Sequence, residues 1–253
     1  MRAGVVFVHG MWSQRGVWDA WLPAFVERGY ECDAVTLPGH HGAAHDAEVA
    51  GVGFAECVDT VAKAAARFDR PILIGHSMGG LIVQQLATRL SLRAAVLINS
   101  AAPRAVFPLR PKMLPGLARH FLRWGLWNGV LCLSRREADY LLYSGLGPSE
   151  RERLFASTVG ESGRIAYQLG FGRLGWSQVH EVDPSRIRCP MLLLAGRRDR
   201  MIPVGVSRAV ARFYGAKLTY REFPDNAHWL LGEAGYGERI GDVLTWLAQQ
   251  TPN

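Results

Sequence analysis

The stretch Ile72-Leu73-Ile74-Gly75-His76-Ser77-Met78-Gly79-Gly80 runs from an apolar strand through a tight turn into a helix, with a serine at the turn. From Met78 to Leu90, apolar residues recur at one-turn spacing, which is the period of a helix that is buried on one side. The glycines on either side of the serine remove Cβ atoms that would collide where the backbone turns this sharply. The stretch therefore predicts a serine hydroxyl exposed between a strand and the N-terminus of a helix.

Strand and helix patterns alternate on both sides of this turn. The buried-strand patterns, rich in Val, Ile, Leu and Ala, are 5–8, 31–37, 71–74, 94–98, 191–195 and 218–223. The helical patterns are 17–28, 54–68, 78–90, 204–214 and 236–249. Alternation of elements of this length implies βαβ crossovers. The sequence thus predicts an α/β fold with a doubly wound, mostly parallel sheet.

The alternation stops at Pro103. From there to about His180 the sequence has no buried-strand pattern, and Pro and Gly residues punctuate helical patterns instead. We therefore expect a helical cap over 103–180. It would be inserted into a single core formed by 1–102 and 181–253.

The expected cap carries the positive charge of the chain. Seven Lys and Arg residues, with no Asp or Glu, lie from Arg104 to Arg136, and they equal the whole formal charge of +7. The first helical pattern of the cap has an apolar face with Leu114, Leu117, Phe121 and Trp124, and a basic face with Lys112, Arg119 and Arg123. Two interpretations stay open. The basic face is in contact with water only, or it meets an anionic carrier protein, a phosphorylated acyl donor or an acidic membrane surface.

Composition argues against several other classes of protein. No apolar run approaches the ~18 to 20 residues of a membrane span, and residues 1–5 lack the apolar region of a signal peptide, so we expect a cytoplasmic protein. The four cysteines have no C-x-x-C spacing, which predicts neither a zinc cluster nor a disulfide framework. No nucleic-acid recognition motif, P-loop or Rossmann glycine pattern is present. We therefore expect no nucleic-acid partner, no metal and no cofactor.

Two residues downstream of the serine could activate it. A serine hydroxyl needs a base that accepts its proton and an acid that orients the base. Asp199 follows the predicted strand at 191–195, and His228 follows the last strand, so both are expected on the same rim of the sheet as Ser77. Asp225, close before His228, is the alternative acid. We favour Asp199, because a residue in the position of Asp225 more often shapes the turn.

These features together resemble the α/β-hydrolase superfamily. They are the G-x-S-x-G motif around Ser77, the order Ser, Asp, His along the chain, and the start His9-Gly10-Met11-Trp12 after the first strand. The resemblance extends over nearly the whole chain. The start is similar to the short-N-terminus branch that contains plant-type carboxylic esterases and hydroxynitrile lyases.

The resemblance implies a cofactor-free serine hydrolase acting on a small-molecule carboxylic ester or thioester with an apolar acyl or alcohol part. It also implies an oxyanion hole formed by the backbone N–H groups of Met11 and Met78. The residues expected to line the substrate pocket are Trp12, Phe121, Trp124, Met201 and Trp229.

Other activities stay open. One is a thioesterase or methyl-esterase that takes its acyl substrate from a carrier protein docked on the cap, and others are a carbon–carbon hydrolase, a lactonase and a hydroxynitrile lyase. From a different class, a non-catalytic ligand-binding protein is compatible with the same fold.

Overall fold

The computed structural model describes residues 3–42, 46–121, 124–171 and 179–250. At its centre lies a six-stranded sheet with the order β2-β1-β3-β4-β7-β8, in which each neighbouring pair of strands is parallel. The strands are β1 (Gly4–Val8), β2 (Glu31–Val35), β3 (Ile72–His76), β4 (Ala94–Ile98), β7 (Met191–Gly196) and β8 (Leu218–Phe223). The predicted α/β fold with a parallel sheet is confirmed.

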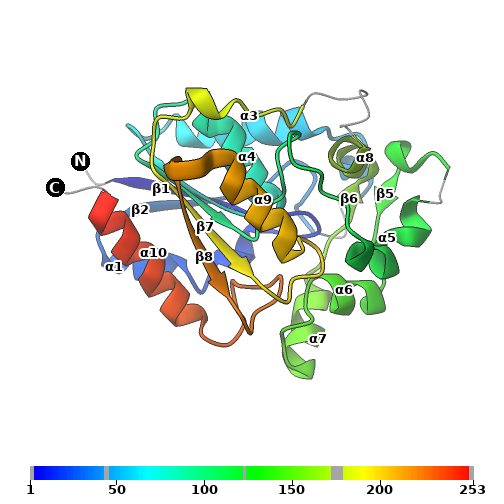
Figure 1. Cartoon of the computed structure of the whole chain (residues 1–253). Coiled ribbons are helices and arrows are strands. Elements are labelled where there is room, and N and C mark those ends of the chain that lie inside the picture. Colours follow the sequence, from blue (N-terminus) through cyan, green and yellow to red (C-terminus); the bar gives the residue numbers. More distant parts are fainter. Residues whose placement is uncertain (1–2, 43–45, 122–123, 172–178, 251–253) are drawn as a thin grey trace.

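Helices cover both faces of this sheet. On one face lie α3 (Phe54–Ala65), α4 (Met78–Ala87) and α9 (Val204–Tyr214), and on the other lie α1 (Leu22–Glu27) and α10 (Tyr236–Gln250) (Figure 1). Every residue of β1, β3, β4 and β7 is buried, which explains why these strands are continuous apolar runs without alternation. On the α1 side, the ring of Phe7 packs 5.1 Å from the rings of both Trp18 and Phe25.

The prediction of one helix over 17–28 is wrong. A 3-10 turn, η1 (Arg15–Trp18), comes first, and α1 begins only at Leu22. Pro23 lies in the first turn of α1, where its missing N–H removes no hydrogen bond of the helix and its fixed φ suits a helix start.

Further elements lie between β4 and β7 in the chain, and we call residues 103–180 the insert. Its helices are α5 (Leu114–Phe121), α6 (Arg135–Leu141), α7 (Pro148–Ala156) and α8 (Gly163–Phe171), and they lie together on the right of Figure 1. The insert also contains an antiparallel pair of short strands, β5 (Val130–Leu131) and β6 (Glu161–Ser162). The expectation of a purely helical insert is corrected in this respect, because strands this short leave no alternation in the sequence.

The amphipathic helix predicted at the start of the insert also needs correction. α5 ends at Phe121, and Gly125, with a left-handed φ of 75°, begins a 3-10 turn, η4 (Leu126–Asn128). Leu117 is buried as predicted, but 52% of Leu114 and 91% of Trp124 are exposed. The apolar face is therefore shorter than the sequence suggested.

Acidic residues neutralise part of the basic charge of the insert. The guanidinium of Arg119 donates hydrogen bonds to both carboxylate oxygens of Glu137, and Arg135 forms ion pairs with Asp139 and Glu152. These acids lie beyond Arg136 in the chain, so counting charge along the sequence did not include them. Arg123 lies outside the described residues.

A buried polar pair connects the insert to the core. Nε2 of His40, in the loop after β2, lies 3.1 Å from Oε2 of Glu161 in β6, and both side chains are fully buried. Nδ1 of His40 lies 2.8 Å from the carbonyl oxygen of Pro38. Burial alone would lower the pKa of His40, but the charge of Glu161 and these hydrogen bonds raise it overall.

Among the described residues, no helix is both long enough and apolar enough to cross a membrane.

Candidate active site

Ser77 lies at the turn between β3 and α4 in a strained backbone conformation. Its φ of 54° and ψ of −118° fall in a region of backbone conformation that residues other than glycine rarely adopt. Three backbone hydrogen bonds hold the turn. The N–H of Ser77 donates to the carbonyl of Ile98 at 3.0 Å, and its own carbonyl accepts from the N–H groups of Gly80 and Ala101. Rare geometry held in this way is typical of functional sites.

The glycines of the motif are required by close packing. A Cβ at Gly75 would clash with the backbone of Gly79, and a Cβ at Gly79 would clash with the carbonyl of Val8. A Cβ at Gly10 would come within 2.8 Å of the Cβ of Ser77. The chain that leaves β1 therefore passes directly against the serine.

His228 and Asp199 meet on the rim of the sheet. Nδ1 of His228 lies 2.8 Å from Oδ2 of Asp199, and each residue is 1% exposed. The other carboxylate oxygen of Asp199 accepts hydrogen bonds from the backbone N–H groups of Met201 and Ile202, each at 2.8 Å. These donors stabilise the charged carboxylate and fix its orientation, so it can select one tautomer of the imidazole.

Asp225 does not reach His228. Its side chain is 79% exposed and forms an ion pair with Arg198 at 2.6 Å. Of the two aspartates considered from the sequence, the structure brings Asp199 to the histidine.

Two buried side chains that no sequence pattern predicted hold the loop of His228. The amide nitrogen of Asn99 donates to the carbonyls of Ala227 and His228 at 2.8 Å, and its oxygen accepts from the N–H of Gly196. The carboxylate of Glu233 accepts from the N–H groups of Ala227 and Trp229. The partners of Asn99 lie 97 to 129 positions away in the chain, so no local pattern could reveal it.

His76 supports the same loop. Its Nε2 lies 3.0 Å from the carbonyl oxygen of His228, to which it donates, and its ring lies 4.8 Å from the ring of His228. Burial lowers the pKa of His76 to about 3, so this ring is neutral near pH 7 and serves as a hydrogen-bond donor.

A cavity of about 80 Å³ borders Ser77, and we call it the inner cavity. The core contributes Met11, Trp12, Met78, Ala101, Met201 and Ile202 to its lining, and the insert contributes residues that include Leu117, Leu131 and Leu169. The lining is almost entirely apolar. Among the described residues that line it, only His120 carries an imidazole, and its Nε2 lies 3.4 Å from Oε2 of Glu137.

Some of the residues expected to line the pocket line the inner cavity, and others do not. Trp12 and Met201 line the inner cavity. Trp229 is not among the residues that line it, and its ring lies 5.4 Å from the ring of His76 and 5.2 Å from the ring of Tyr143. The expectation for Trp124 is wrong, because this side chain lies exposed beyond the end of α5. The side chain of Phe121 lies outside the described part of the structure.

The two backbone N–H groups considered for an oxyanion hole belong to residues beside the serine. Met78 is the first residue of α4, and the first N–H groups of a helix have no acceptor within the helix. Met11 follows Gly10, which packs against Ser77. Both methionines line the inner cavity together with the serine.

Comparison with known proteins identifies the family. Residues 5–238 match the alpha/beta hydrolase family, and the chain therefore belongs to it. Protein ABHD8 of Homo sapiens is 26% identical over 248 residues, which cover 90% of this chain and 54% of that protein. The chain thus spans about half the length of this relative.

A second relative matches over nearly its whole length. The pimeloyl-[acyl-carrier protein] methyl ester esterase of Xanthomonas campestris pv. campestris (strain B100) is 32% identical over 253 residues, covering 95% of this chain and 92% of that protein. Among solved structures, the monoacylglycerol lipase of Paleococcus ferrophilus superposes with a TM-score of 0.74 at 23% identity, over 98% of this chain and 95% of the lipase. This structural likeness shows the shared fold.

Proposed function

We propose that the protein is a serine hydrolase that cleaves a carboxylic ester or thioester with an apolar acyl or alcohol part. One observation carries the proposal. A serine in a strained turn borders an apolar cavity, and a buried Asp199–His228 pair lies on the same rim of the sheet. Membership of the alpha/beta hydrolase family, with an esterase and a lipase among the proteins it resembles, supports hydrolase chemistry.

In the proposed reaction, Oγ of Ser77 attacks the carbonyl carbon while Nε2 of His228 accepts the hydroxyl proton. Asp199 stabilises the imidazolium, and the N–H groups of Met11 and Met78 bind the negative oxygen of the tetrahedral intermediate. His228 then gives the proton to the departing alcohol or thiol, which leaves an acyl-enzyme. A water molecule, deprotonated by His228, attacks this acyl group, and the carboxylic acid and Ser77 are released.

The insert would act as a cap. The proposed division is a core of 1–102 and 181–253 with a cap of 103–180. It is supported by the inner cavity, whose walls come from both parts. A substrate would then need the cap to move, or to leave an entrance, before its carbonyl reached Ser77.

A second candidate is an esterase or thioesterase that acts on acyl groups bound to a carrier protein. The name of the Xanthomonas relative favours it, as does the basic insert. Since Arg119 and Arg135 already pair with acids, exposed cations such as Lys112 and Arg136 are better candidates for an anionic docking face.

A panel of esters tests the main proposal. We expect nitrophenol release from p-nitrophenyl acetate and butyrate and much slower release from the palmitate, because the inner cavity is small. Matching S-acyl N-acetylcysteamine compounds separate ester from thioester preference. If purified, folded protein releases product from none of these compounds, the non-catalytic ligand-binding alternative would replace the proposal.

The carrier hypothesis needs a different comparison. For a double variant Lys112→Gln/Arg136→Gln, we expect kcat/KM to fall with acyl groups on a carrier protein and to stay unchanged with the same acyl groups on N-acetylcysteamine. Added salt should mimic the loss, because exposed charges are screened beyond ~8 Å at physiological ionic strength. Equal, salt-insensitive kinetics on both substrates would exclude docking of a carrier on these cations.

A further inference from the structure

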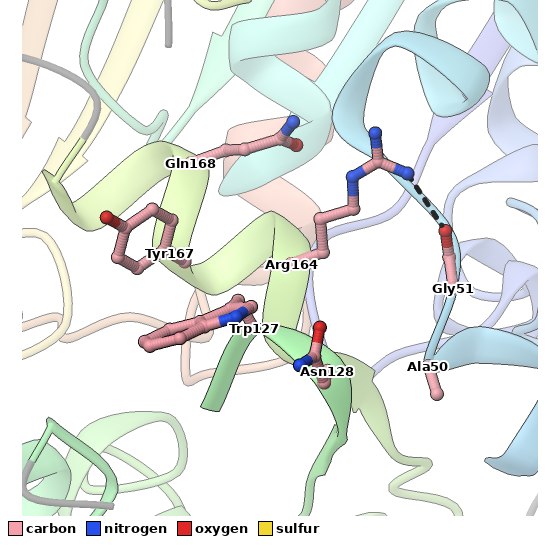
Figure 2. A pocket seen from close by; sticks show the side chains of 7 residues that line it. All are labelled: Ala50, Gly51, Trp127, Asn128, Arg164, Tyr167 and Gln168. Carbon is pink, nitrogen blue, oxygen red and sulfur yellow. Dashed lines mark hydrogen bonds between the residues drawn. The ribbon is translucent and has the colours of Figure 1, made fainter. Parts of the chain in front are cut away.

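A second and larger cavity, of about 700 Å³, lies between the insert and the core segment at residues 50–51 (Figure 2). Its lining comes from three segments that are distant in sequence: Ala50 and Gly51 after α2 (Asp46–Val49), Trp127 and Asn128 of η4, and Arg164, Tyr167 and Gln168 of α8. We call this cavity the outer groove.

Helix α8 separates the outer groove from the inner cavity. Arg164, Tyr167 and Gln168, spaced by three and four positions, share one face of the helix and line the groove. Ala166 and Leu169, on the other side, line the inner cavity. The two cavities therefore lie back to back, and a ligand in the outer groove would not occupy the position next to Ser77.

Aromatic rings form one wall of the groove. The rings of Trp127 and Tyr167 lie 5.4 Å apart, and Figure 2 shows them side by side at one end. The row continues from Trp127 to Trp124 at 5.5 Å and from Tyr167 to Phe171 at 5.6 Å. Trp127 is 37% exposed, so it offers an aromatic surface to a flat or apolar ligand.

Hydrogen-bond donors line the rest of the groove. Arg164 is exposed, and one of its N–H groups donates to the carbonyl of Gly51 at 3.3 Å, which holds the guanidinium beside the groove (Figure 2). The amide oxygen of Gln168 already accepts from the N–H of Phe54, so the NH₂ group is the part of this amide suited to a ligand. The amide of Asn128 adds further donors.

The charge of the lining selects the kind of ligand. None of the described residues that line the groove is Asp or Glu, and Arg164 contributes a positively charged guanidinium. A neutral sugar presents hydroxyl groups that donate and accept, but it carries no charge to match the guanidinium of Arg164. A carboxylate or phosphate presents acceptors only, which suits the donors of this groove.

We propose that the outer groove is a second ligand site that binds a small aromatic anion. The ring of the ligand would pack against Trp127 and Tyr167, whose planes are tilted by 58° to each other, and its carboxylate or phosphate would accept hydrogen bonds from Arg164. This site goes beyond the proposed hydrolase activity and does not depend on Ser77.

Calorimetric titration of the Ser77→Ala protein with phenyl phosphate and with benzoate tests the site and separates the two anionic groups. We expect at least one of them to bind. Arg164→Gln should weaken its binding about tenfold or more, because it removes a charge-assisted hydrogen bond. Trp127→Leu should weaken it to a similar degree. Arg212→Gln, a matched control at an exposed position of α9, should leave the dissociation constant unchanged.

Benzyl alcohol and inorganic phosphate, each lacking one half of the ligand, should bind more weakly than the aromatic anion. Thermal unfolding of each variant verifies that it is folded. The proposal is overturned if neither aromatic anion binds, if Arg164→Gln binds as tightly as its parent, or if methyl glucoside binds in preference. Because the titration uses protein without the nucleophile, its failure would leave the hydrolase proposal untouched, and inactivity toward esters would leave this one untouched.

Discussion

Nδ1 of His228 lies 2.8 Å from Oδ2 of Asp199, although 29 positions separate the two residues in the chain. Both are buried, and backbone N–H groups occupy the other oxygen of the carboxylate. The carboxylate is thus held by the fold before any substrate arrives. In the proposed mechanism, this pair sets the tautomer and the orientation of the base.

Replacement of Asp199 by Asn should leave the protein folded but lower kcat by several orders of magnitude. An amide can donate to Nδ1 and favour the wrong tautomer, and the corresponding change in a serine protease costs roughly 10,000-fold. The matched control is Asp225→Asn, which alters only an exposed ion pair and should change kcat little. Equal losses in the two variants, measured with p-nitrophenyl butyrate, would remove Asp199 from its proposed role.

Asn99 should act as a positioning residue. Asn99→Ala leaves the buried carbonyls of Ala227 and His228 without their donor, which we expect to cost about 1–3 kcal/mol in the free energy of unfolding. It should also lower kcat more than it changes KM, because the loop of His228 loses its anchor. Asn226→Ala, in the same loop but half-buried, is the control and should have a small effect. A stable Asn99→Ala protein with normal kcat would contradict this role.

Stability should fall as the pH drops below about 6.5. Burial lowers the pKa of both His9 and His76 to about 3, whereas the unfolded chain takes up these protons near the ordinary value of 6.5. The stability contributed by the neutral rings is therefore complete above about pH 6.5 and is lost as the pH falls toward 3. For His76, this lowers the free energy of unfolding by about 2 kcal/mol between pH 7 and pH 5.

The variant His76→Gln isolates this effect, because glutamine keeps an N–H donor for the carbonyl of His228 but does not titrate. Urea unfolding at pH 7 and pH 5 should show a smaller difference in the variant than in the parent. His41→Gln, on an exposed residue, is the control. The pKa of His40 is raised, so the stability that this residue contributes is complete below about pH 6.5 and is lost at higher pH. Because His40 is present in both the parent and the variant, it affects this comparison little. Equal pH dependence in parent and His76→Gln would contradict the prediction.

Much of the core could be predicted because its signals are local and strong. The turn around Ser77 combines a buried strand, closely packed glycines and a helical period within a short segment. The buried strands were visible as apolar runs because helices cover both faces of the sheet. The positions of Asp199 and His228 followed from the parallel topology, in which loops at the carboxyl ends of strands share one rim.

The parts that could not be predicted depend on contacts between distant segments. Asn99 and Glu233 gain their roles from backbone groups that only the folded chain brings near them. Glu137 neutralises Arg119, although Arg119 lies in a stretch that appeared uniformly basic and Glu137 follows directly after that stretch. Trp124 was assigned to the pocket by extending the period of α5 past its end at Phe121, and Gly125 next to Trp124 has a left-handed φ that a helix does not contain.

The central claim is that Ser77 is the nucleophile, and active-site labelling tests it most directly. The protein is incubated with a fluorophosphonate that modifies activated serines, digested, and analysed by mass spectrometry. We predict a single adduct on Ser77, loss of ester hydrolysis in proportion to labelling, and no adduct on a folded Ser77→Ala variant. An adduct on another serine, or full hydrolysis by Ser77→Ala, would contradict the account.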